Sequence, residues 1–159
     1  MWEQPLLKAH IPPTILAAAN ARRTIAPEED YADTAAAREA RKLADRGVSV
    51  SIGAHGQQDG IGAHWEMWSF VKGGWTPLQA LQAATVNPAR TLGMSRDIGS
   101  LEVGKLADLV VLDANPLENI RNTEQVSKVM LGGRLYDAAT LNEEVTGNHA
   151  RQAYWWERN

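Results

Sequence analysis

Ser100-Leu-Glu-Val-Gly-Lys-Leu-Ala-Asp-Leu-Val-Val-Leu-Asp113 carries the strongest structural signal in this chain. Gly104 and Lys105 place a turn glycine and a cation just before an apolar run. That run, Leu109-Val-Val-Leu112, predicts a short buried strand. Residues 126–131 and 134–136 flank Gly132-Gly133 and predict a hairpin with a glycine turn. The sequence therefore predicts a small β unit late in the chain.

Helical signals precede this β unit. In Thr76-Pro-Leu-Gln-Ala-Leu-Gln-Ala-Ala-Thr-Val-Asn-Pro-Ala-Arg90, Thr76 and Pro77 predict an N-cap and a first helical residue. Leu78, Leu81 and Ala84 then share one helical face. Asn87-Pro88 is expected to break this helix, with a further short helical turn ending at Gly93.

Upstream, the pattern is helix, glycine, strand. Asp33 is a plausible N-cap for a helix to Arg46, whose narrow apolar face would hold Ala36, Ala40 and Leu43, together with Ala37 and Ala44. Gly47 would end it, and Val48-Ser-Val-Ser-Ile52 predicts a strand. A Gly-rich loop over 53–62 follows, then a helix from His64 to about Lys72. This order is the second half of a β-α-β unit, and sites in such folds form in loops after strands.

Weaker helical signals lie at the two ends. Pro12-Pro13 predicts the start of a short helix to Arg23. Residues 148–157 predict a terminal helix, whose Trp155-Trp156 pair needs a packing partner.

Composition excludes several classes of protein. The chain has 159 residues with 16 Lys and Arg against 19 Asp and Glu, a net charge of −3. This balance does not fit a nucleic-acid-binding surface or a polybasic membrane patch. There is no Cys, which excludes disulfides and thiolate metal sites. We expect no membrane span and no signal peptide at Met1-Trp2-Glu3-Gln4, hence a soluble protein whose compartment, cytoplasmic or periplasmic, stays open.

Residues Gly47 to Asp137 resemble the C-terminal end of amidohydrolase-superfamily enzymes, in particular imidazolonepropionase- and prolidase-like members. The resemblance implies an α/β fold, namely the C-terminal segment of a (β/α)8 barrel plus strands of a small composite β-sandwich. It implies barrel elements over 1–96, sandwich return strands over 97–137 and a helical tail over 138–159. A whole barrel takes about 250 residues and does not fit in this chain.

The same resemblance implies metal-assisted hydrolysis of a C–N bond in an amide, a cyclic amide or a dipeptide. A bound divalent cation, zinc by preference, lowers the pKa of water and polarises the carbonyl. The family's His-x-His pair is absent here, and its last-strand Asp is replaced by His55. His55 is therefore the candidate metal ligand and catalytic base, and Asp59 could supply a catalytic carboxylate in the same loop.

Three further residues are candidates for a substrate pocket, namely His64, Trp65 and Glu66. Each also has a structural interpretation. His64 could simply start a helix, Trp65 could belong to the core, and Glu66 could be a solvated or capping carboxylate. Asp59 could likewise be an ordinary loop residue.

Three functional hypotheses follow. The chain could be the C-terminal portion of an amidohydrolase, inactive and metal-free alone, whose small-molecule site needs a missing N-terminal barrel portion. It could instead be a non-catalytic remnant that serves as a binding or structural subunit, which the loss of the last-strand Asp favours. It could also be a self-contained α/β enzyme using His55 and Asp59 without metal. An open barrel edge would also promote self-association.

Overall fold

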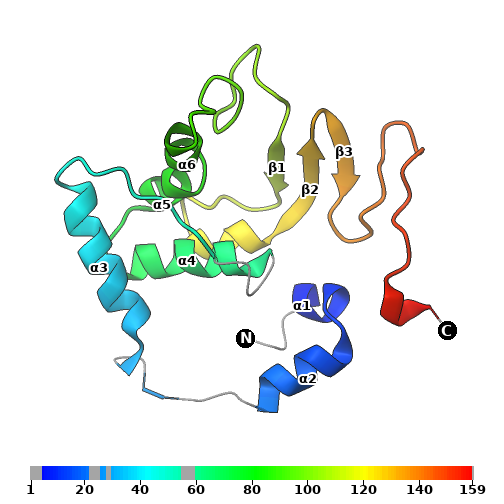
Figure 1. The fold of residues 1–159 in the computed structure, drawn as a ribbon, viewed down its shortest axis with the longest axis horizontal. Coiled ribbons are helices and arrows are strands. Elements are labelled where there is room, and N and C mark those ends of the chain that lie inside the picture. The colour runs from blue at the N-terminus through cyan, green and yellow to red at the C-terminus, as the bar shows by residue number, and fades with distance from the viewer. Residues whose placement is uncertain (1–4, 22–25, 28–29, 55–59, 159) are drawn as a thin grey trace. The chain divides into compact units, whose positions relative to one another are not determined.

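The computed structural model describes residues 5–21, 26–27, 30–54 and 60–158, a mixed helix and strand structure (Figure 1). The chain divides into two compact units. One comprises Met1–Ala32 with Gln152–Asn159, and the other Asp33–Arg151. No helix in the described ranges is both long enough and apolar enough to cross a membrane.

The smaller unit holds two short helices, α1 (Pro5–His10) and α2 (Pro13–Ala21), and the 3-10 turn η3 (Trp155–Glu157). Leu7 is its buried apolar residue, and His10 Nδ1 lies 2.8 Å from the hydroxyl of Tyr154. The sequence predicted α2 but not α1, whose first residue, Pro5, suits a first helical turn.

The predicted terminal helix over 148–157 is wrong except for η3. Its backbone is occupied by other partners. The N–H of Arg151 donates to the side-chain oxygen of Asn142 at 2.9 Å, and the carbonyl of His149 accepts from the N–H of Glu143 at 3.0 Å. These bonds to distant residues compete with the local bonds that a helix needs.

In the larger unit, helices α3 (Ala32–Ala44) and α4 (Ile61–Lys72) approach closely where α4 ends. Of the predicted apolar face of α3, Ala37 is buried, whereas Leu43 is 50% exposed. Asp33 lies inside α3 rather than at its N-cap, and its carboxylate accepts from the hydroxyl of Ser69 at 2.8 Å. Trp75 adds a second hydrogen bond to α3, since its Nε1 donates to the carbonyl of Ala37 at 2.9 Å.

Helix α5 (Pro77–Ala84) starts as predicted, with Thr76 and Gln79 forming a reciprocal capping box. Its fully buried residues are Ala80 and Ala83, whereas Leu78 of the predicted face is 54% exposed. Helix α5 contacts α4. Small buried side chains allow such close packing.

Helix α6 (Val86–Thr91) contains the Asn-Pro pair that was expected to end a helix. The break lies two residues before that pair, at Thr85 between α5 and α6. Pro88 is tolerated because it falls in the first turn of the new helix.

The predicted strand Val48–Ile52 pairs with no other strand in the described part of the chain. Its backbone groups bond to the helices instead. The side-chain amide of Asn87 donates to the carbonyl of Val50 at 2.8 Å, and the N–H of Ile52 donates to the carbonyl of Ala83 at 3.0 Å.

The β unit is an antiparallel sheet in the order β1-β2-β3, formed by Leu109–Leu112, Val126–Leu131 and Arg134–Asp137. The predicted hairpin is confirmed, with both turn glycines at positive φ. β1 is less buried than expected, because Val110 is 54% exposed. After β1 the chain forms turns, and the 3-10 helix η2 spans Ile120–Glu124.

The Gly-Lys-Leu-Ala-Asp stretch has a structural role. Gly104 takes a φ of 95°, which suits glycine, and Lys105 Nζ donates to the carbonyl of Ser95 at 2.7 Å. Asp108 accepts from the N–H of Gly132 at 2.6 Å, and the N–H of Gly133 donates to the carbonyl of Ala107 at 3.1 Å. These bonds join the turn before β1 to the turn of the hairpin.

We expect Gly73→Ala to lower the free energy of unfolding by about 1–3 kcal/mol, as overpacking does. A Cβ at Gly73 would lie 2.5 Å from the Cβ of Ala37 and 2.9 Å from its carbonyl carbon. Urea denaturation measures the change. The matched control is Gly53→Ala, where a Cβ meets no atom within 4 Å. Equal effects of the two substitutions would refute the close helix contact.

Candidate functional site

Three of the predicted site residues, His64, Trp65 and Glu66, lie together near the start of α4. All three are half-buried. The two others, His55 and Asp59, lie outside the described residues. The helix begins at Ile61, three residues before the predicted start, so the three side chains belong to its first two turns.

Glu66 has a defined structural partner. Its Oε2 accepts a hydrogen bond of 2.6 Å from the backbone N–H of Gly53. The carboxylate therefore caps the end of segment 48–53, not its own helix. A charged acceptor makes such a bond stronger than a neutral one. Glu66 thereby holds the chain two residues before His55.

His64 is a half-buried histidine whose Nδ1 atom is buried and has no hydrogen-bond partner in the described chain. Burial lowers the pKa of His64 below its ordinary value, and the nearby Glu124 carboxylate opposes this shift. His64 is therefore neutral at neutral pH, and one ring nitrogen is available for a hydrogen bond or a ligand bond.

A cavity of about 340 Å³ lies beside Glu66, between α3, α4 and segment 50–53. Its polar side chains are Asp33, Ser51, Glu66 and Ser69. The Ser51 hydroxyl is buried with no partner in the described chain. The other walls are apolar, from Phe70 and the alanines of α3. The cavity thus combines two carboxylates with two hydroxyls, a set suited to accepting and donating hydrogen bonds.

The described residues do not fit a metal centre. Among the residues that the structure describes, no group of three or more His, Asp or Glu side chains is placed to hold an ion. A catalytic zinc site needs three protein ligands and an open position. His64 and Glu66 do not make that set, and Glu66 already accepts the bond from Gly53.

The sequence did not predict the hydrogen-bond partners of Asn87 and Trp68. Asn87 was interpreted only as a helix breaker, yet it binds Val50. Trp68 Nε1 donates at 3.1 Å to both the carbonyl of Ile120 and the hydroxyl of Thr123, and the Arg121 guanidinium lies 4.6 Å from its ring centre. A buried Trp requires a partner for its N–H, but sequence alone does not indicate which one.

Comparison with known proteins places these observations in context. The sequence model of the amidohydrolase family matches residues 9–136. Ochratoxinase from Aspergillus niger is 34% identical over 94 residues, which cover 57% of this chain and 20% of that protein. Imidazolonepropionase from Symbiobacterium thermophilum is 35% identical over 103 residues, covering 60% of this chain and 24% of that protein.

A solved structure of a Xaa-Pro dipeptidase with methionine bound in its active site superposes with a TM-score of 0.59. It is 34% identical, and the match covers 64% of this chain and 25% of the dipeptidase. The chain thus spans only a fifth to a quarter of the length of these three proteins.

The burial of neutral His64 predicts a pH dependence of stability. The unfolded chain takes up a proton on this histidine near pH 6.5, whereas the folded chain does so only at lower pH. The unfolded state therefore binds more protons in this window, so stability present above about pH 6.5 is lost as the pH falls. Urea midpoints for the chain and for His64→Gln, measured from about pH 8 to 5, isolate the effect. Parallel curves for the two proteins would contradict it.

Removing the Glu66 carboxylate should free the N–H of Gly53. We expect Glu66→Ala to raise the amide hydrogen-exchange rate of Gly53 about tenfold, and Glu66→Gln to raise it less, because the amide oxygen still accepts. Glu39→Ala is the matched control, since Glu39 pairs with Lys42 on the surface of α3. An unchanged rate in Glu66→Ala would show that the bond does not hold this segment.

Proposed function

This chain belongs to the amidohydrolase family, and we propose that it forms the C-terminal part of a metal-dependent hydrolase that cleaves a C–N bond. The family match over residues 9–136 is the observation that carries this proposal. The substrate is a small molecule with an amide, a cyclic amide or a dipeptide bond. Relatives named as an imidazolonepropionase and a Xaa-Pro dipeptidase support this substrate class.

In this proposal, segment 48–52 is the last strand of a (β/α)8 barrel, and residues 1–96 are barrel elements. Residues 97–137 are return strands of a β-sandwich, and 138–159 are a C-terminal tail. Segment 48–52 has no partner strand among the described residues, which supports this assignment because a barrel strand needs neighbouring strands on both sides. Such neighbours would come from segments other than those described.

The proposed role of the chain's own residues is to position the catalytic loop. Asn87 holds Val50 and Glu66 holds Gly53, so the residues just before His55 are attached to α6 and α4. Such attachment limits the positions that a catalytic side chain two residues later can take. His55 would act as a base or a ligand, with Asp59 as a second carboxylate group.

Because the described residues form no metal centre, most ligands for a divalent cation, zinc by preference, must come from other segments of the complete protein. When bound, the cation would activate water and polarise the substrate carbonyl. We infer that the 159-residue chain by itself is inactive and holds no metal tightly, and that its partner is the remaining barrel portion or a second copy of itself.

The alternative is a non-catalytic remnant that binds a partner or supports an assembly. One feature of the sequence favours it, since the resemblance to the family implies that His55 replaces an aspartate. A neutral imidazole lacks the negative charge that stabilises a dication.

The test compares the 159-residue chain with the product of the complete reading frame that contains it. Both are loaded with zinc and assayed on Xaa-Pro dipeptides, N-acyl amino acids and cyclic amides. We expect the complete product to exceed its metal-stripped form by at least about a hundredfold. We expect the 159-residue chain to show no turnover.

Two variants of the complete product sharpen this test. His55→Ala should lower kcat/KM by about a hundredfold, whereas the surface control Glu39→Ala should leave it unchanged. A folded, zinc-loaded complete product with no activity on any substrate class would favour the non-catalytic alternative. Turnover by the 159-residue chain would overturn the incomplete-site proposal.

A further inference from the structure

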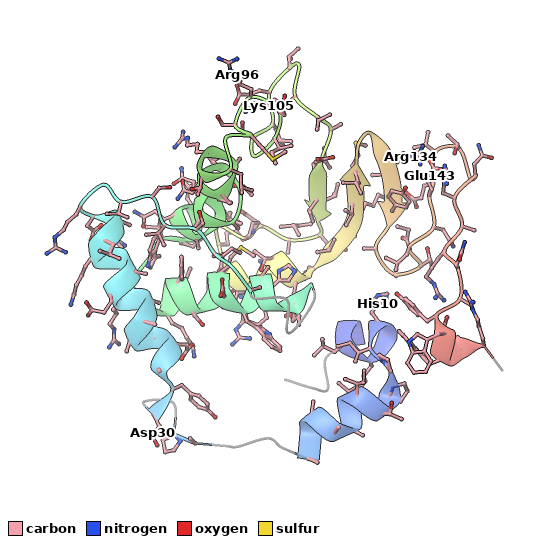
Figure 2. The ribbon with its side chains drawn as sticks, in the orientation of Figure 1. His10, Asp30, Arg96, Lys105, Arg134 and Glu143 are labelled. Atoms are coloured by element: carbon pink, nitrogen blue, oxygen red, sulfur yellow. The ribbon has the colours of Figure 1, made fainter. Side chains whose placement is uncertain are left out.

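A second, mainly polar hollow lies between α6 and the loop over 95–105. Its volume is about 600 Å³, and the charged side chains that line it are Arg90, Arg96, Lys105 and Glu102. None of the predicted site residues lines it. Figure 2 shows Arg96 and Lys105 near one another at the same end of the unit, with Arg134 set apart on β3.

The two arginines at this hollow have positive charges that no described carboxylate neutralises. Arg90 and Arg96 are exposed, and neither guanidinium group makes a hydrogen bond or ion pair with another described residue. A guanidinium offers five N–H donors in a planar fork that matches the oxygens of a phosphate or carboxylate. Two guanidinium groups that line one hollow can bind the same anion.

Lys105 adds a fixed positive charge to the hollow. Its side chain is only 12% exposed, and its Nζ donates to the carbonyl of Ser95 at 2.7 Å and to the hydroxyl of Ser100 at 2.5 Å. Glu102 is its counter-charge at 3.2 Å. The Ser100 hydroxyl first, and Lys105 next, lower the pKa of Glu102, so this carboxylate is ionised. Three cations therefore face one carboxylate.

The loop itself contributes backbone donors. Within the described chain, the N–H groups of residues 99–104 donate no hydrogen bond to another residue. Gly99, Ser100, Glu102, Val103 and Gly104 all line the hollow. Consecutive free N–H groups beside positive side chains are a common way to bind anions.

We propose that this hollow binds a phosphate group, either as free phosphate or as part of a small phosphomonoester. The surplus of two positive charges matches a doubly charged oxyanion better than a single carboxylate. The attraction is local, since the whole chain has a net charge of −3. Arg90 and Arg96 provide side-chain donors, and the loop from Gly99 to Gly104 provides N–H donors.

The test is a titration of the isotope-labelled full chain followed by the amide NMR signals of Gly99 and Gly104. The two probes are inorganic phosphate and glycerol 3-phosphate, at constant ionic strength. We expect saturable shifts of both amides, with Arg90→Gln and Arg96→Gln each weakening the affinity about tenfold. Stronger binding of the ester would identify a phosphomonoester as the ligand, and stronger binding of phosphate the free anion.

Arg134→Gln is the matched control, because Arg134 is also an exposed arginine without a described partner, but lies on β3 outside the hollow. We expect it to leave the affinity unchanged. Circular dichroism checks that each variant is folded. The proposal is overturned if phosphate does not shift these amides, or if Arg134→Gln weakens binding as much as the other two substitutions.

Discussion

The backbone of segment 48–53 is the constraint on which the arrangement of the helices depends. This segment has no described strand partner, yet a partly buried backbone must have its polar groups satisfied. Asn87 of α6, Ala83 of α5 and Glu66 of α4 each supply one bond to it. Three helices are thereby attached to one short segment, and the loop after it starts from a fixed position.

Small residues and tryptophans make the close packing around this segment possible. Gly73 and Ala37 let α3 and the end of α4 meet at a distance that no larger pair permits. Trp75 and Trp68 then donate their indole N–H groups to Ala37 and to η2, so that each joins two elements. The stacking of Phe70 on Trp75 at 4.5 Å completes the contact.

The most recognisable stretch of the sequence, Gly104 to Asp108, makes structural contacts in the described chain. Within Gly104 to Asp108, the lysine closes the turn before β1 and the aspartate binds the turn between β2 and β3. A family signature can therefore mark a fold element without marking a site. In this chain, the match over 9–136 carries the family assignment, while the chemistry that we propose is assigned to His55 and its loop.

The sequence by itself determined the local features, because these depend on neighbouring residues only. Short-range rules predict the capping box at Thr76, the glycine hairpin at residues 132 and 133, and helix α3. The resemblance to amidohydrolases also came from contiguous motifs. Predicting His64, Trp65 and Glu66 as neighbours on one helix was equally local.

Only the tertiary structure decided which faces are buried and where the polar groups find partners. It buried Ala80 and Ala83 and left Leu43 and Leu78 of the predicted faces half-exposed, because close helix contacts admit only small side chains. It joined Glu66 to Gly53 across thirteen residues, and it replaced the predicted C-terminal helix by bonds to residues 142 and 143. Such pairings depend on distances between residues far apart in the chain, which no local pattern encodes.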